Sequence, residues 1–107
     1  MEYKKITAII RTEHLEKVEE GLKKLHVSGI TITQVIGYGE YSNLFTSDWT
    51  SINTRIEIYT QHNKIDAIVK GIMEAAHTGL SGDGIVVIQP VDHIYRIRTK
   101  ELMKLGD

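Results

Sequence analysis

Cysteine is absent from the 107-residue chain, and proline occurs only once. Without cysteine the chain has no disulfide scaffold, no thiolate nucleophile and no zinc site of cysteine ligands. A surplus of one charge is also absent: 13 Lys and Arg stand against 14 Asp and Glu, so nothing attracts the whole chain to nucleic acid or anionic lipid. The longest hydrophobic runs have four residues, as at 85–88, which excludes a membrane-spanning segment.

The composition that remains is that of an ordinary globular domain. Hydrophobic residues make up 41% and charged residues 25%, which excludes a disordered chain and a coiled-coil rod. A length of 107 residues is enough for one hydrophobic core and too short for two. Residues 1–5 lead into a strand-like run and do not resemble a signal peptide. We therefore expect one domain over residues 1–107 of a soluble, cytoplasmic protein.

Hydrophobic periodicity predicts strands that alternate with helices. The strands are expected at residues 5–11, 30–38, 55–60 and 85–88. The helices are predicted from apolar stripes formed by Leu15, Val18, Leu22 and Leu25, and by Ile65, Ile68, Val69, Ile72 and Met73. Thr12 and Asn63 are the expected N-caps. Pro90 is expected to limit the last strand, with a further short strand within 91–98 and a helical turn at 100–105.

This order of elements is typical of an α+β, ferredoxin-like βαββαβ sandwich. Two helices can cover only one face of a four-stranded sheet. The strands at 5–11 and 85–88 are apolar on both faces, so the second face needs a further partner. Self-association is the simplest arrangement that supplies one.

A glycine-rich loop at residues 77–84 is the first candidate site. Gly79, Gly82 and Gly84 leave the backbone free to turn N–H groups toward an anion. The loop is not a Walker A loop, because it lacks the Gly-Lys-Ser/Thr ending and runs from a helix into a strand. A tight helix-to-strand connection is the alternative interpretation.

Arg96 and Arg98 form the second candidate site. They are two residues apart, so on an extended chain both side chains point to the same face. Two guanidinium groups on one face suit a phosphate, which each can bind through charge-assisted hydrogen bonds. The alternative is an exposed strand edge that charge protects from unwanted pairing.

Residues 39–54 show no hydrophobic period and predict a long loop. The segment is rich in Ser, Asn and Thr but carries Tyr41, Phe45 and Trp49. Loops of this length in small domains are uncommon and are usually functional or disordered. The aromatic side chains of residues 39–54 are expected either to pack against the domain or to anchor a partner.

The residues give no sign of a catalytic or metal site. No pair among the five histidines has the i, i+4 helical spacing, with a partner carboxylate, that a zinc site usually shows, so surface or capping roles are favoured. No nucleophile elbow accompanies a Ser-His-Asp order. Asp83 is the only carboxylate in the glycine-rich loop, and one carboxylate does not make an acid–base pair.

The loop, the arginine pair and the topology together resemble one family, the P-II nitrogen-regulatory signalling proteins. Residues 78–84 read Thr-Gly-Leu-Ser-Gly-Asp-Gly and resemble its B-loop, Thr-Gly-x-x-Gly-Asp-Gly. Residues 96–99 resemble its C-terminal Arg-Ile-Arg-Thr. Residues 4–10, 15–22 and 28–39 are similar to its opening strand, its first helix and the strand that ends in Gly-aromatic-Gly. The resemblance covers nearly the whole chain.

The resemblance implies a homotrimer that binds adenine nucleotides (ADP, AMP or ATP) in clefts between subunits and regulates a membrane transporter or metabolic enzyme. It implies no catalysis, no required cofactor, no metal and no nucleic acid. The implied nucleotide contacts are Thr31, Gly37, Gly39, Thr78, Gly79, Gly82, Asp83, Gly84, Arg96 and Arg98. Residues 39–54 match the partner-docking T-loop, for which the implied contacts are Tyr41, Phe45, Trp49 and Arg55.

The chain departs from the family pattern around the implied phosphate site. Ile85 follows the Gly-Asp-Gly, where the family has lysine. Glu40 and Tyr41 stand where the family has Arg-Gln, of which the glutamine helps to hold Mg-ATP and 2-oxoglutarate. The T-loop is several residues shorter and lacks the tyrosine-bearing segment that is uridylylated in some members. These departures predict a divergent member for which ADP or AMP binds at least as well as ATP.

Two other functions remain alternatives. A metal-handling protein of the divalent-cation-tolerance type has the same trimeric architecture, but that class does not need the two motifs, and the absence of cysteine weakens it further. A small nucleotide hydrolase would need a base or a water-positioning residue, and the sequence offers none.

Overall fold

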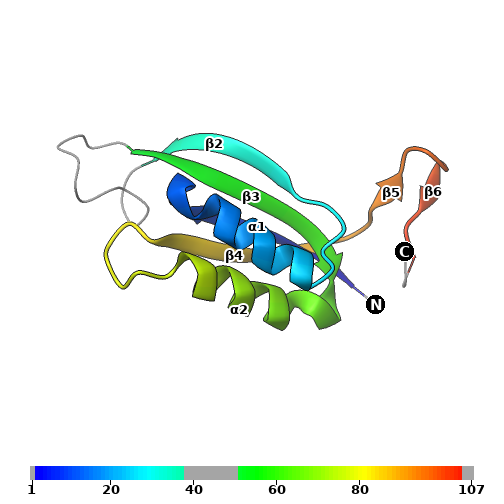
Figure 1. Ribbon diagram of the computed structural model, residues 1–107. Coiled ribbons are helices and arrows are strands. Elements are labelled where there is room, and N and C mark those ends of the chain that lie inside the picture. Colours follow the sequence, from blue (N-terminus) through cyan, green and yellow to red (C-terminus); the bar gives the residue numbers. More distant parts are fainter. Residues whose placement is uncertain (1, 38–50, 105–107) are drawn as a thin grey trace.

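The computed structural model describes residues 2–37 and 51–104. Within them the chain forms an antiparallel sheet with two helices packed on one face, and a small hairpin projects beyond the far end of the sheet (Figure 1). The main elements are β1 (Tyr3–Ile10), α1 (Leu15–Lys24), β2 (Thr31–Gly37), β3 (Ser51–Gln61), α2 (Ile65–Ala76) and β4 (Gly84–Val91). The 3₁₀ turns η1 (Thr12–His14) and η3 (His62–Lys64) lead into the helices, and β5 (Tyr95–Arg96) and β6 (Glu101–Leu102) form the hairpin.

The sheet has the strand order β2-β3-β1-β4, with β1 paired antiparallel to both β3 and β4. This arrangement of βαβ units confirms the predicted ferredoxin-like α+β fold. The register matters for the site, because Ile10 at the end of β1 is paired with Gly84, the first residue of β4. The segment after β1 therefore lies beside the segment that leads into β4.

The core lies between the sheet and the helices. Alternate residues of β1 and β3 point toward the helices, because side chains of a strand alternate between its two faces. The residues buried there include Ile6, Ala8, Ile10, Val18, Leu22, Ile56, Ile58, Ile65, Ile68 and Ile72. Burial of each large aliphatic side chain contributes about 1.5–3 kcal/mol.

The predicted helix caps are wrong. Thr12 and Asn63 each lie within a 3₁₀ turn, and the helices begin after His14 and Lys64 without a side-chain cap. The Thr12 hydroxyl instead lies 2.9 Å from the hydroxyl of Thr54 in β3. Thr12, which the local sequence predicts as the N-cap of α1, instead uses its side chain for a tertiary hydrogen bond.

The predicted helical stripes are right except at their C-terminal ends. Leu25 is 37% exposed and Met73 is 54% exposed, although the stripes predict that both face the sheet. Leu25 lies just past the end of α1. Met73 follows the buried Ile72 in α2, and the next position along a helix turns away from the packed face by about a quarter of a turn.

Two strands extend further than the sequence predicts. β3 begins at Ser51, so residues 51–54 belong to the sheet and not to the loop predicted at 39–54. Asn53 and Thr54 are buried there despite their polarity, since the ladder pairs them with β2 and β1. β4 continues through Pro90 to Val91, because it is an edge strand on which the missing N–H can face outward.

The predicted helical turn at 100–105 is also wrong over the part that the structure describes. Lys100 has a φ of 59°, outside the helical range, and β6 follows at once. The short strand predicted within 91–98 corresponds to β5. Residue 105 lies outside the described residues.

The sequence predicts that strands 5–11 and 85–88 are apolar on both faces. The open face of the sheet instead carries both polar and apolar side chains. β1 presents Lys5 and Thr7 there beside Ile9, in register with β3. The Lys5 ammonium lies 2.6 Å from the Glu57 carboxylate, and this hydrogen bond raises the pKa of Lys5 and lowers the pKa of Glu57. β4 contributes the half-buried Ile85 and the exposed Val87. Among the described residues, neither helix is long and apolar enough to cross a membrane.

Candidate functional site

The glycine-rich loop connects α2 to β4 through three backbone positions that favour glycine. Gly79, Gly82 and Gly84 have φ values of 86°, 96° and 116°. These angles lie in the region that side chains disfavour, so the glycines are needed for the turn itself. The predicted tight helix-to-strand connection is therefore confirmed, and binding of an anion by the loop stays a prediction.

Asp83 closes the loop on itself. Its carboxylate accepts hydrogen bonds from the backbone N–H of Thr78 at 2.8 Å and of Gly79 at 2.9 Å, and from the Thr78 hydroxyl. The same hydroxyl oxygen accepts the Leu80 N–H at 3.2 Å. Three consecutive N–H groups thus point into the loop. The N–H groups of Ser81 and of Gly82 donate no hydrogen bond to another described residue. Ser81 is exposed whereas Gly82 is buried, so the Ser81 N–H is the one open to a ligand.

The surroundings of Asp83 keep its carboxyl ionised. Burial raises its pKa, but the Thr78 hydroxyl, the N–H groups of Thr78 and Gly79 and the charge of Arg11 outweigh burial and lower the pKa to about 2, from 3.8. The side chain is 22% exposed. Asp83 therefore serves as a charged acceptor for the loop over the whole physiological pH range.

Arg11 attaches the loop to the end of β1. Its side chain is buried, its Nη2 donates to the Ser81 carbonyl at 2.9 Å and its Nε lies 3.5 Å from the Asp83 carboxylate. Sequence reasoning missed this residue. The available signal was topological, because an arginine directly after one strand lies beside the loop that begins the antiparallel neighbour.

Gly84 is required for packing between β1 and β4. A Cβ at this position would lie 1.8 Å from the carbonyl oxygen of Ile9. No side chain can be accommodated at that distance. Gly84 thus has a structural explanation that is independent of any ligand.

The arginine pair lies in the β5–β6 hairpin. Arg96 belongs to β5, whereas Arg98 lies in the turn at residues 97–100 that joins the two strands. The chain is not extended there, since the Lys100 N–H donates to the Arg96 carbonyl at 2.9 Å and closes the turn. The predicted reason for their shared face is therefore wrong. Both side chains nevertheless line one hollow of about 340 Å³.

The glycine-rich loop and the arginine pair lie at opposite ends of the sheet (Figure 1). β4 connects them, with Gly84 next to the loop and Val91 toward the hairpin. A strand of eight residues spans roughly 24 Å. Within one chain, these two halves of the predicted site are too far apart to hold one phosphate group.

The other predicted contacts are spread over β2 and β3. Gly37 is buried at the end of β2 that lies toward the glycine-rich loop, and Thr31 is exposed at the start of the same strand. Arg55 lies inside β3 and not in the partner-docking loop, and its Nε is 3.5 Å from the Glu57 carboxylate. The remaining predicted contacts lie outside the described residues: Gly39, Tyr41, Phe45 and Trp49.

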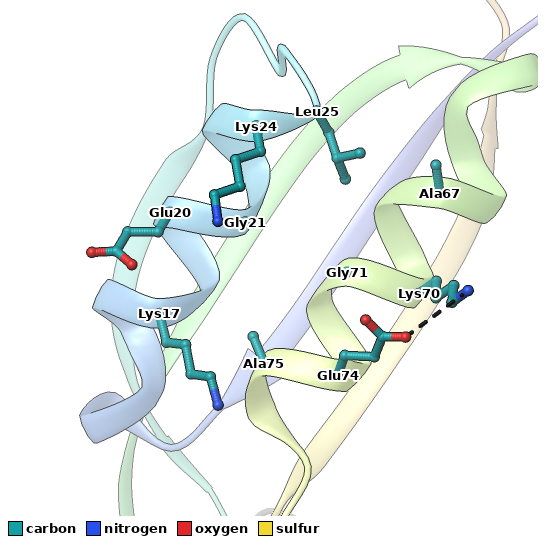
Figure 2. Close-up of a pocket in the computed structure, with 10 residues that line it drawn as sticks. All are labelled: Lys17, Glu20, Gly21, Lys24, Leu25, Ala67, Lys70, Gly71, Glu74 and Ala75. Atoms are coloured by element: carbon teal, nitrogen blue, oxygen red, sulfur yellow. Dashed lines mark ion pairs between the residues drawn. The ribbon is translucent and has the colours of Figure 1, made fainter.

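A groove between α1 and α2 lies apart from all of these residues. Figure 2 shows Gly21, Gly71 and Ala75 along it, with Lys17 and Lys24 beside it. Its volume is about 540 Å³. None of the residues predicted for the site lines it.

The model of one protein family, Nitrogen regulatory protein P-II, matches residues 3–101. The chain belongs to the P-II family. This match confirms the resemblance carried by the glycine-rich loop and the Arg-Ile-Arg-Thr segment. Members of the family are regulatory signalling proteins.

Individual P-II proteins are similar over most of the chain. The nitrogen regulatory protein P-II of Azospirillum brasilense is 34% identical over an alignment of 111 residues that covers 97% of each chain. P-II 2 of Methanothermobacter thermautotrophicus is 38% identical over 105 residues, 92% of this chain and 91% of that one. The solved structure of Arabidopsis thaliana PII bound to citrate superposes with a TM-score of 0.81 at 27% identity, covering 95% of this chain and 86% of that one.

Proposed function

We propose that this chain is a P-II signal-transduction protein that binds an adenine nucleotide between two copies of a homotrimer and thereby regulates a partner transporter or enzyme. The observation that carries the proposal is the separation of the glycine-rich loop from Arg96 and Arg98 at opposite ends of one sheet. Both elements suit a phosphate, and only a second copy can bring them together. A site shared between copies explains why neither half is complete in one chain.

The loop supplies a backbone donor and the hairpin supplies charge. On the loop side, the N–H group of the exposed Ser81 donates no hydrogen bond to another described residue. On the hairpin side, Arg96 and Arg98 line one hollow. Each charge-assisted hydrogen bond to a phosphate contributes about 1.5–3 kcal/mol. Asp83 contributes to nucleotide binding by holding the loop in place, because its carboxylate oxygens accept hydrogen bonds from the N–H groups of Thr78 and Gly79.

The residues near the loop favour a nucleotide with fewer phosphates. Ile85, where the family has lysine, presents an aliphatic side chain on the open face of β4 and supplies no charge for a further phosphate. Each added phosphate needs a compensating donor. We therefore propose that ADP or AMP binds at least as tightly as ATP. With Tyr41 in place of the glutamine, 2-oxoglutarate leaves the ATP affinity unchanged, since reciprocal coupling needs both sites.

Regulation follows from docking and not from catalysis. We propose that residues 39–54 with Tyr41, Phe45 and Trp49 contact the partner, that the nucleotide is an effector, that no cofactor is required and that the protein acts in the cytoplasm. Arg55 directly follows this segment, inside β3, and so connects the partner-docking segment to the sheet.

Calorimetry with ADP, AMP and ATP tests the nucleotide, with and without Mg²⁺ and 2-oxoglutarate. The expected result is binding of ADP or AMP at least as tight as that of ATP, with no effect of 2-oxoglutarate. A clear preference for ATP together with 2-oxoglutarate synergy contradicts the proposed selectivity. Binding of copper or zinc without any nucleotide favours the metal-handling alternative.

Mixed oligomers test whether the site is shared. An Asp83→Ala chain and an Arg96→Ala/Arg98→Ala chain are each expected to bind poorly alone, in a particle of three times 12.1 kDa by light scattering. When they are refolded together in equal amounts, roughly one quarter of the sites receive an intact loop from one copy and an intact hairpin from another. Recovery of nucleotide binding to that level supports the shared site. A mixture that binds no better than its components contradicts it.

A further inference from the structure

One buried charge near the glycine-rich loop has no part in the proposed contacts with nucleotide. Arg11 is 7% exposed, which is rare for an arginine without a specific partner. Arg11 is the residue directly after β1, and the last residue of β1, Ile10, pairs with Gly84 at the start of β4. Its hydrogen-bond and ion-pair partners among the described residues are in the loop, at Ser81 and Asp83.

The two contacts act on different atoms of the loop. The Arg11 Nη2 donates to the backbone carbonyl of Ser81 at 2.9 Å, and the Nε lies 3.5 Å from the Asp83 side chain. The first contact is a hydrogen bond, which a planar, rigid guanidinium directs, and the second is an attraction between charges, since the Nε donates no hydrogen bond to a described residue. The carbonyl of Ser81 belongs to the same peptide plane as the N–H of Gly82. A hydrogen bond to that carbonyl therefore turns the Gly82 N–H in the opposite direction, away from Arg11.

We infer that Arg11 is the positioning residue of the glycine-rich loop: it holds the Ser81 carbonyl and the Asp83 carboxylate, and so keeps the loop in the conformation that receives the phosphate of the nucleotide. The inference rests on the proposed function for the identity of the ligand. Arg11 acts through the loop and does not itself touch the phosphate, because its guanidinium is buried against Ser81 and Asp83.

The chemistry explains why lysine is a poor replacement. A lysine ammonium is a single point of charge on a flexible stem, and it can approach Asp83 without holding the Ser81 carbonyl in a set direction. Arg11→Lys therefore keeps the charge and loses the orientation. Arg11→Gln loses both.

The neighbouring Thr12 offers a matched control. Its hydroxyl lies 2.9 Å from that of Thr54 and is not bonded to the loop. Thr12→Val removes this one hydrogen bond one residue away from Arg11 and preserves side-chain shape. A general loosening of the end of β1 affects both positions alike, whereas a specific role in the loop affects only Arg11.

The experiment measures ADP affinity by calorimetry and backbone amide shifts by NMR for the wild type, Arg11→Lys, Arg11→Gln and Thr12→Val. We expect ADP affinity to fall at least tenfold in Arg11→Gln and by a smaller factor in Arg11→Lys, with amide shift changes concentrated in residues 77–84. Thr12→Val is expected to bind as the wild type does. Adding Asp83→Asn to Arg11→Gln should cost less than the sum of the two single changes, because both act through one loop.

The outcomes separate this inference from the proposed function. Wild-type affinity for ADP in both Arg11 variants overturns the inference while the proposed function stands, and so does an equal loss in Thr12→Val. A wild-type protein that binds no adenine nucleotide contradicts the proposed function. In that case the amide shifts still decide about Arg11, since unchanged shifts at residues 77–84 in Arg11→Gln overturn its positioning role.

Discussion

The glycine-rich loop and the β5–β6 hairpin are both proposed to bind phosphate, but they differ in how far contacts within the chain hold them in place. In the loop, Asp83 accepts hydrogen bonds from Thr78 and forms an ion pair with Arg11, and the conformation is determined within one chain. In the hairpin, Arg98 is exposed in a turn, and Ile97 beside it is 93% exposed. Folding of one chain therefore forms the loop half of the proposed site, whereas the hairpin half needs contact with a second copy.

The largest expected effect concerns the packing of the loop side against β1. Gly84→Ala would place a Cβ 1.8 Å from the Ile9 carbonyl oxygen at a φ of 116°, so the strands must separate. We expect the free energy of unfolding to fall by about 3 kcal/mol or more. Denaturant unfolding at matched protein concentration measures this loss.

Gly21→Ala is the control for that prediction. Gly21 lies within α1, and a Cβ added there would meet no atom of another part of the protein within 4 Å. Alanine there should stabilise the protein by roughly 0.5–1 kcal/mol, because glycine weakens a helix. Equal stability of Gly84→Ala and the wild type would mean that the close contact between β1 and β4 is absent in solution.

The next effect separates binding from folding on the hairpin side. Arg96→Ala and Arg98→Ala are each expected to weaken nucleotide binding by roughly 1–3 kcal/mol, because each removes a charge-assisted phosphate contact. Unfolding should change little, since the hairpin lies outside the core. Calorimetry and thermal unfolding on the same samples check both statements. If both variants bind every adenine nucleotide as the wild type does, the arginines are not part of the site.

The loop also predicts a dependence of stability on pH. The pKa of Asp83 is lowered from 3.8 in the unfolded chain to about 2 in the folded chain. A lowered pKa stabilises the fold above pH 4, and this contribution is lost as the pH falls from about 4 to about 2. The loss is on the order of 1–2 kcal/mol for this partly exposed group.

Asp83→Asn is the control for the pH dependence. It removes the titrating carboxyl, so the difference in unfolding free energy between wild type and variant should shrink as the pH falls from about 4 to about 2. Unfolding in denaturant at a series of pH values measures this difference. A difference that stays constant over that interval would show that the folded-state pKa of Asp83 is not lowered.

The smallest expected effect adds charge to the loop side. Ile85→Lys supplies the cation that the loop lacks, and together with Glu40→Arg it should shift the ratio of ATP to ADP affinity toward ATP. We expect a shift of about 1 kcal/mol, close to fivefold, measured by calorimetry. Val87→Lys lies two residues further along the same face of β4 and should leave the ratio unchanged. An equal shift in both variants would indicate a general effect of positive charge.

Much of the fold could be predicted because it is written in local patterns. The stripe through Val18 and Leu22 and the one through Ile65, Ile68 and Ile72 identify α1 and α2, and all five side chains are buried. The strands follow from β-branched runs, and the glycine-rich loop follows from three glycines whose φ values only glycine favours. Errors fell where tertiary contacts override local preference, as at Thr12, which bonds to Thr54 instead of capping α1.

The sequence by itself determined the order of the elements from β1 to β4, the family and the two motifs that carry the family resemblance, because periodicity and short motifs depend on neighbours along the chain. Only the tertiary structure decided that β3 reaches back to Ser51, that Arg11 holds the loop, and that the loop and the arginines lie at opposite ends of the sheet. These facts depend on which strands pair and in which register. Pairing joins residues such as Ile10 and Gly84 that are far apart in the chain, and the free energy that selects it comes from burial of the whole sheet against the helices.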